Sequence, residues 1–195
     1  GADDSDIVDY SASSTGITVT LANDGALTSL NHNIGGDFTD SLTNIEGIKG
    51  SSTVSNTLTG NNMNNTLIGG SQADIIKGIS GNNYLNGGAG LDTIYAGTGS
   101  DTIIGGSSDA NWLYYSDISA DVNVNLKAGT ATYGSSTDTI SQIRNLQMGN
   151  GTNIVEGNSD ANSFIGGTGI DTLSYSGASN AVTLNVTTAG AGTST

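Results

Sequence analysis

Gly87-Gly-Ala-Gly-Leu-Asp-Thr-Ile-Tyr95 is the stretch that decides the fold, and Gly166-Gly-Thr-Gly-Ile-Asp-Thr-Leu-Ser174 repeats its pattern later in the chain. In both segments three glycines precede an aspartate at the sixth position and an apolar residue at the eighth. Glycine permits turn conformations that side chains forbid, and aspartate stabilises turns. Each segment therefore predicts a turn followed by a short strand.

The same nine-residue spacing extends well beyond these two segments. Seven consecutive units run from Ser51 to Leu113, three more begin at Met148, Gly157 and Gly166, and another opens the chain. Two units make one coil of eighteen residues, whose strands pair in parallel about 4.8 Å apart. The eighth side chain then points inward and the seventh and ninth point outward. The eighth positions of the seven units are Leu58, Leu67, Ile76, Leu85, Ile94, Ile103 and Trp112.

The Gly-Gly-x-Gly-x-Asp-x-apolar-x pattern of the two quoted segments resembles the repeat of RTX, or haemolysin-type, calcium-binding proteins. The resemblance implies an all-β fold, a parallel β-roll or β-helix solenoid of nonapeptide repeats. It also implies that Ca²⁺ ions lie between stacked turns, held by sixth-position carboxylates and by turn carbonyls.

Stacked turns are eighteen residues apart, so the sequence also predicts which sixth positions meet. Asp74 and Asp92 form the only Asp–Asp pair in the seven-unit run, and Asn83–Asp101 and Asn153–Asp171 are weaker candidate sites with one charge fewer. In the family geometry, carbonyl oxygens for the first site come from Gly69, Gly70, Gln72, Gly87, Gly88 and Gly90.

Asparagine is as common as aspartate at the sixth position. Five of the eleven sixth positions are Asp, five are Asn and one is Ala, so we expect two to four bound ions, fewer than one per turn. Their affinity should resemble that of extracellular modules, about 10⁻⁴–10⁻³ M. The alternative is that Asn and Asp cap turns and stack as hydrogen-bonded ladders without metal.

A longer repeat separates the blocks of nine-residue units. The segments 10–21, 115–126 and 175–186 align, each with alternating apolar residues such as Val122, Val124 and Leu126, which predicts half-buried strands. The first two continue to a second shared element, 40–45 and 138–143. We therefore divide the chain into a first extended β unit (1–50), seven repeats (51–113), a second extended unit (114–147), three repeats (148–174) and the truncated start of a third unit (175–195). We expect a segment of a longer repetitive protein, or a protomer that associates end to end.

Two further expectations concern apolar and aromatic residues of the repeats. Ile68, Tyr84 and Ile104 form an apolar stripe, over which we expect Val122–Leu126 to fold, with a partner chain as the alternative cover. Trp112, at an eighth position, is expected to close the core, which disfavours sugar stacking by Trp112, Tyr114 and Tyr115.

Composition excludes several classes of function. The 195 residues carry 18 acidic side chains against 4 Lys and Arg, a net charge of −14, which disfavours nucleic acid and a polybasic membrane anchor. No apolar run is long enough for a spanning helix, and the absence of Cys excludes disulfides and thiol chemistry. The single histidine, His32, is expected in a polar loop, and we find no catalytic motif, so we expect no enzyme activity.

The sequence predicts a non-catalytic calcium-binding structural segment of a secreted bacterial adhesin or surface filament, which folds and stiffens on binding Ca²⁺ outside the cell. A folding and secretion module attached to an extracellular protease, lipase or epimerase is the alternative. Ice binding is a minor alternative, since the third positions, Thr53, Asn62, Ser71, Ser80, Ala89, Thr98 and Ser107, form no regular array. A glycan or other surface receptor stays unidentified.

Overall fold

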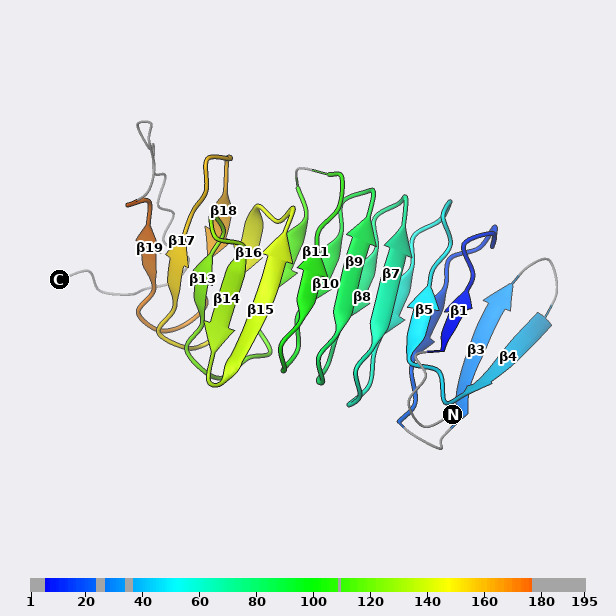
Figure 1. Ribbon diagram of the computed structural model, residues 1–195. Helices are drawn as coiled ribbons and strands as arrows, with labels where there is room; N and C mark the ends of the chain where they lie inside the picture. The colour runs from blue at the N-terminus through cyan, green and yellow to red at the C-terminus, as the bar shows by residue number, and fades with distance from the viewer. Residues whose placement is uncertain (1–5, 24–26, 34–36, 109, 177–195) are drawn as a thin grey trace.

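Short strands separated by glycine-rich turns coil into an elongated roll with two facing sheets (Figure 1). This computed structural model describes residues 6–23, 27–33, 37–108 and 110–176, with the backbone alone described for 27–33 and 37–39. Most strands are three to five residues long because each nine-residue unit supplies one turn and one strand. No helix occurs within these ranges, and hence none that is long and apolar enough to cross a membrane.

The two main sheets differ in width. The wide sheet has ten strands, in the order β1 (Ile7–Asp9), β5 (Gly47–Lys49), β7 (Thr66–Gly70), β9 (Tyr84–Gly88), β11 (Thr102–Ile104), β15 (Ser136–Ser141), β14 (Thr130–Tyr133), β13 (Asn123–Asn125), β17 (Ile154–Glu156) and β19 (Thr172–Ser174). The narrow sheet has seven, in the order β18 (Ser163–Ile165), β16 (Asn145–Gln147), β12 (Trp112–Tyr114), β10 (Thr93–Tyr95), β8 (Ile75–Lys77), β6 (Thr57–Thr59) and β2 (Thr18–Thr20). A separate antiparallel hairpin pairs β3 (Leu27–Asn33) with β4 (Asp37–Thr43).

Parallel pairing in register stacks the eighth positions into two apolar ladders between the sheets. In the narrow sheet Leu58 pairs with Ile76, and Ile76 with Ile94. In the wide sheet Leu67 pairs with Leu85, and Leu85 with Ile103. All six side chains are fully buried, whereas the flanking seventh and ninth positions are half-buried or exposed. The fold class expected from the repeat is confirmed: an all-β parallel roll with eighteen residues per coil.

The expectation that Trp112 closes the core is wrong. Ile76 pairs with Ile94, eighteen residues on, but Ile94 pairs with Leu113, nineteen residues on. One extra residue in the turn before β12 thus moves the inward position from Trp112 to Leu113, which is fully buried while Trp112 is half-buried. On the outer face Tyr95 and Tyr114 stack with ring centroids 4.8 Å apart.

The second extended unit lies within the wide sheet and does not cover it. Strands β13, β14 and β15 form an antiparallel meander, whose outer members pair in parallel with β17 and β11. Val122 and Val124 point into the core, with 1% and 0% of their surface exposed. The expectation that Val122–Leu126 folds over the outer stripe is therefore wrong, and this meander makes the wide sheet wider than the narrow one (Figure 1).

Two other sequence expectations concern the extended units. His32 lies in β3, opposite Phe38, rather than in a loop. The third extended unit falls almost wholly on 177–195, outside the described residues.

Candidate metal centre

Sixth-position side chains form two ladders along the edges of the roll. In one ladder the backbone N–H groups of Asn56, Asp74 and Asp92 donate to Oδ1 of Asp74, Asp92 and Asn111, at 2.6–2.8 Å. In the other, the N–H groups of Asn65, Asn83 and Asp101 donate to Oδ1 of Asn83, Asp101 and Asp138, at 2.6–2.9 Å. The structure thus brings together the expected pairs Asp74–Asp92 and Asn83–Asp101.

The aspartates of these ladders are buried and only half satisfied. Asp74, Asp92 and Asp101 are 1%, 1% and 2% exposed. Their Oδ1 atoms accept the ladder bonds, but within the described part of the chain their Oδ2 atoms have no hydrogen-bond partner. A buried oxygen without a donor is unfavourable by about 1–3 kcal/mol, and more when it carries charge. A bound cation, or a proton on the carboxyl group, would remove this unfavourable term.

Asparagines at the equivalent position show what such a partner would contact. Oδ1 of Asn83 accepts a ladder bond as Asp does, while its Nδ2 donates to the carbonyls of Ser80 and Gly81, at 3.3 and 3.2 Å. Where aspartate replaces asparagine, a second carboxylate oxygen takes the place of that donor. A hydrogen-bond acceptor then faces the carbonyl oxygens of the turn, which are acceptors too.

The pair Asn153–Asp171 shows this convergence of oxygens most fully. Nδ2 of Asn153 lies within hydrogen-bonding distance of the carbonyl oxygens of Gly149, Gly151 and Gly166, at 3.3–3.4 Å, and of Oδ1 of Asp171, at 2.7 Å. Four oxygens from two stacked turns thus surround one amide nitrogen. Asn153 is buried, whereas Asp171, on the last described coil, is exposed.

Glycines let the carbonyls of successive turns approach one another. A Cβ at Gly69 or Gly87 would collide with Oδ2 of the aspartate in the same turn, Asp74 or Asp92. Gly88 has φ +98°, and a Cβ there would meet the Gly70 oxygen of the preceding coil.

Contacts place three carbonyls of the predicted set, those of Gly70, Gln72 and Gly88, along the same edge. Gly70 O accepts the N–H of Ala89, and Gly88 O that of Ser107, so these carbonyls point along the stack. Gln72 O faces Gly90, whose φ is +113°. The turns 69–74 and 87–92 therefore lie one above the other with carbonyl oxygens between them.

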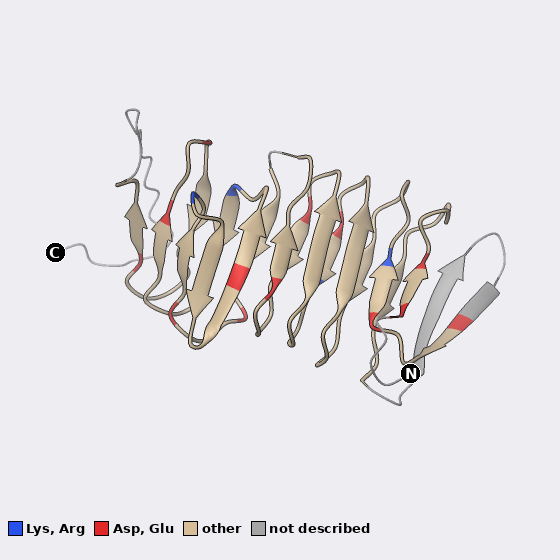
Figure 2. Ribbon diagram, viewed as in Figure 1, with Lys and Arg blue, Asp and Glu red and all other residues tan. Residues whose placement is uncertain are grey.

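Burial sets the electrostatics of the ladders. It raises the pKa of Asp74, raises that of Asp92 to about 6, where the nearby Asp74 carboxylate adds to the effect, and raises that of Asp101 to about 7. Few cations compensate, since acidic side chains recur along the roll and Lys and Arg are rare (Figure 2). Burial thus disfavours the ionised form of each carboxylate, and a bound cation would favour it.

Asp138 is a ladder member that the nine-residue spacing does not predict. Asp138 is fully buried, its Oδ1 accepts the N–H of Asp101 at 2.8 Å, and the hydroxyl of Tyr115 donates to its Oδ2 at 2.8 Å. Tyr10 makes the same contact with Asp40 at 2.7 Å in the first extended unit. The signal was present, because Asp138-Thr-Ile140 repeats Asp101-Thr-Ile103 letter for letter.

Carboxylates alone cannot complete a metal site here. Among residues 6–23, 27–33, 37–108 and 110–176 no three acidic or histidine side chains gather around one point. A cation would have one or two carboxylates and would fill its shell with backbone carbonyls and water, as Ca²⁺ does with its six to eight oxygen ligands. The stacked turns supply that donor set.

Comparison with protein families agrees with this geometry. The family described as RTX calcium-binding nonapeptide repeat (four copies) matches residues 59–94, 77–109 and 149–177. Over these residues the chain is similar to RTX calcium-binding nonapeptide repeats. The matched RTX segments contain the Asp74–Asp92, Asn83–Asp101 and Asn153–Asp171 pairs. RTX repeats bind Ca²⁺ in general and serve as structural elements. Comparison with curated proteins found no match.

Proposed function

We propose that the chain is a non-catalytic structural segment of a secreted bacterial adhesin or surface filament protein, which folds and stiffens when Ca²⁺ binds between its stacked turns. The unpartnered Oδ2 atoms of Asp74, Asp92 and Asp101 carry this proposal. They are buried anionic atoms on turns whose carbonyls also converge, which is the donor chemistry that Ca²⁺ takes.

The strongest site in this proposal lies between the turns of Asp74 and Asp92. It has two carboxylates one coil apart, with the carbonyls of Gly70, Gln72 and Gly87 between the two turns, and Gly69, Gly88 and Gly90 complete the carbonyl set in this proposal. Asn83–Asp101 and Asn153–Asp171 are weaker sites, because an amide nitrogen already donates to the turn carbonyls there. Two to four ions follow from this ranking.

Calcium would make folding depend on whether the chain lies inside or outside the cell. Without it, ionised aspartates lie buried in a narrow core, and ordering a chain with 30 Gly is entropically unfavourable. Binding joins turns eighteen residues apart, so ion binding and folding become one equilibrium. An exported chain would stay unfolded where Ca²⁺ is scarce and fold where it is plentiful, which suits a surface protein.

A calcium titration after chelation tests the proposal, with far-UV circular dichroism reporting β structure and calorimetry counting ions. We expect a cooperative gain of β signal near millimolar Ca²⁺, two to four ions per chain, and little response to Mg²⁺, which accepts irregular oxygen shells poorly. A chain that is fully folded in chelator, with a Tm that Ca²⁺ does not raise, would refute calcium-coupled folding.

A further inference from the structure

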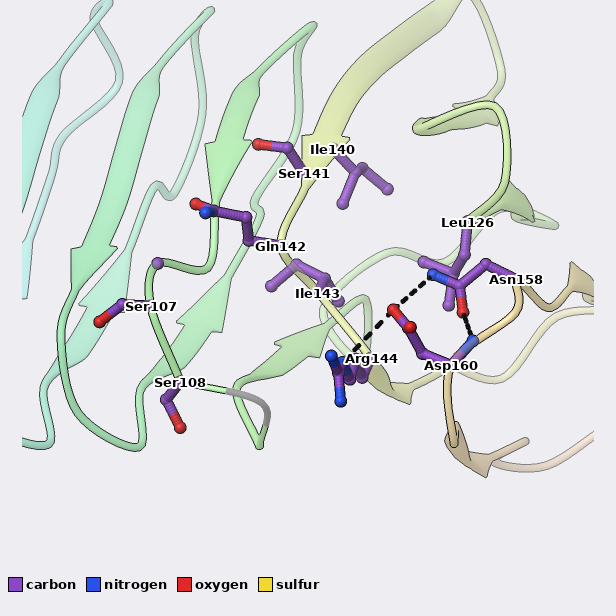
Figure 3. Close-up of a pocket in the computed structure, with 11 residues that line it drawn as sticks. Ser107, Ser108, Leu126, Ile140, Ser141, Gln142, Ile143, Arg144, Asn158 and Asp160 are labelled. Carbon is purple, nitrogen blue, oxygen red and sulfur yellow. Dashed lines mark hydrogen bonds and ion pairs between the residues drawn. The ribbon is translucent and has the colours of Figure 1, made fainter.

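The second extended unit opens a cavity at one edge of the roll. The connection from β11 to β12 spans 105–111 and that from β17 to β18 spans 157–162, but the connection between them, from β15 to β16, has only 142–144. The short connection leaves a gap between two longer turns. A cavity of about 370 Å³ occupies it, near the lower end of the range of about 300–1,000 Å³ for small-molecule sites (Figure 3).

The lining of this cavity has an apolar part and a polar part. Leu126, Ile140 and Ile143 are almost fully buried core residues whose surfaces form its apolar part. The polar part is formed by Ser107 and Ser108 on one side and by Arg144, Asn158 and Asp160 on the other (Figure 3).

A bonded cluster organises the polar side. Nε of Arg144 lies 3.3 Å from Oδ2 of Asp160, and Nδ2 of Asn158 donates to the same oxygen at 3.3 Å. The backbone N–H of Asp160 donates back to Oδ1 of Asn158 at 3.0 Å. Arg144 and Asp160 are only 31% and 39% exposed, so a guanidinium, a carboxylate and an amide are held together at the cavity.

We propose that this cavity binds one residue of a neutral saccharide. Vicinal hydroxyl groups donate and accept at short spacing, which matches an Arg–Asp pair bonded to Asn158, while the C–H face of a sugar ring suits the surface of Ile143 and Leu126.

Charge decides which saccharide fits. The Arg–Asp pair is neutral as a unit, and the net charge of −14 repels anions. A uronic acid would have to compete with Asp160 for the only arginine of the chain. A neutral hexose meets neither obstacle. None of the aspartates or asparagines of the candidate calcium sites lines the cavity, so this inference stands independently of them.

Chemical-shift perturbation in the ¹⁵N-labelled, calcium-saturated chain tests the proposal. The probes are glucose, galactose, mannose and N-acetylglucosamine, with glucuronate as the acidic counterpart of glucose. We expect at least one neutral sugar to shift resonances of the cavity residues with a millimolar Kd, and glucuronate to bind more weakly.

Variants then locate the binding. Asp160→Ala should weaken binding at least tenfold, and so should Arg144→Ala, which removes the other charge of the pair. Asp9→Ala breaks the ion pair with Lys49, of comparable length and exposure but remote from the cavity, and should leave binding unchanged. The proposal is overturned if no neutral sugar binds, if glucuronate binds more tightly, or if Asp160→Ala and Arg144→Ala both retain full binding.

Discussion

Asp92→Asn should stabilise the metal-free chain while removing the strongest of the proposed calcium sites. Asparagine is nearly isosteric and keeps Oδ1 for the N–H of Asp74. Its Nδ2 replaces the unpartnered Oδ2 and can donate to turn carbonyls, as Nδ2 of Asn83 does to Ser80 and Gly81. The substitution therefore removes a buried charge without removing a hydrogen bond of the ladder.

The magnitude follows from the raised pKa. Burial raises the pKa of Asp92 from 3.8 to about 6, which at about 1.4 kcal/mol per pH unit disfavours the ionised form by about 3 kcal/mol at pH 8. Removing that charge should raise the free energy of unfolding by up to this amount in chelator. With a urea m-value of about 1–3 kcal/mol/M, the midpoint should rise by up to about 1–3 M.

Urea denaturation of both proteins in chelator and in 10 mM Ca²⁺ is the assay. Ca²⁺ at 100 times its Kd should raise the free energy of unfolding of the wild type by about 2.7 kcal/mol, and that of the variant by much less. In Ca²⁺ the difference in stability between the two proteins should therefore shrink or change sign. The control Asn83→Asp places a second carboxylate beside Asp101 and should lower stability in chelator. If Asp92→Asn is less stable than the wild type in chelator, the reasoning from the unpartnered oxygen is wrong.

Three further predictions test other parts of the roll. The folded-state pKa values of Asp92 and Asp101 are raised to about 6 and about 7, so the folded chain binds protons more tightly than the unfolded one. The stability in chelator should therefore decrease as the pH rises from about 4 to about 8, and thermal melts across that range will measure it. Gly88→Ala should lower the Tm far more than Gly134→Ala, since both glycines have positive φ but only at Gly88 does a Cβ meet backbone; equal melting temperatures would contradict the close-packed turns. Tyr115→Phe should reduce the free energy of unfolding by about 1–3 kcal/mol, because it leaves a buried carboxylate oxygen without its donor, and an unchanged urea midpoint would argue against that bond.

The nine-residue spacing predicted the roll and its inward positions because each unit buries one apolar side chain at a fixed phase. The prediction failed at Trp112, where one added residue shifts the phase and the neighbouring Leu113 serves the core equally well. Spacing alone cannot reveal such an insertion when both residues are apolar.

The extended units were harder to place. Alternation identified Val122 and Val124 as half-buried strand residues, but it cannot say whether a strand lies over a sheet or extends it. Likewise the stacking of Asp74 on Asp92 follows from the period. The meeting of Asp101 with Asp138, 37 residues on, depends on how the meander returns along the sheet.

The direction of the strands also determines how the molecule responds to tension. Strands run across the long axis of the roll (Figure 1), and each coil contacts only its neighbours. A pull along that axis therefore loads the hydrogen bonds of one coil at a time rather than all together. A detached coil of eighteen residues extends to about 60 Å in place of a rise of about 4.8 Å. Stretched from its ends, the roll should lengthen stepwise, each detached coil becoming about twelve times as long as its rise in the roll. Each asparagine, or each bound ion of the proposed sites, that joins two turns would set the force of one step.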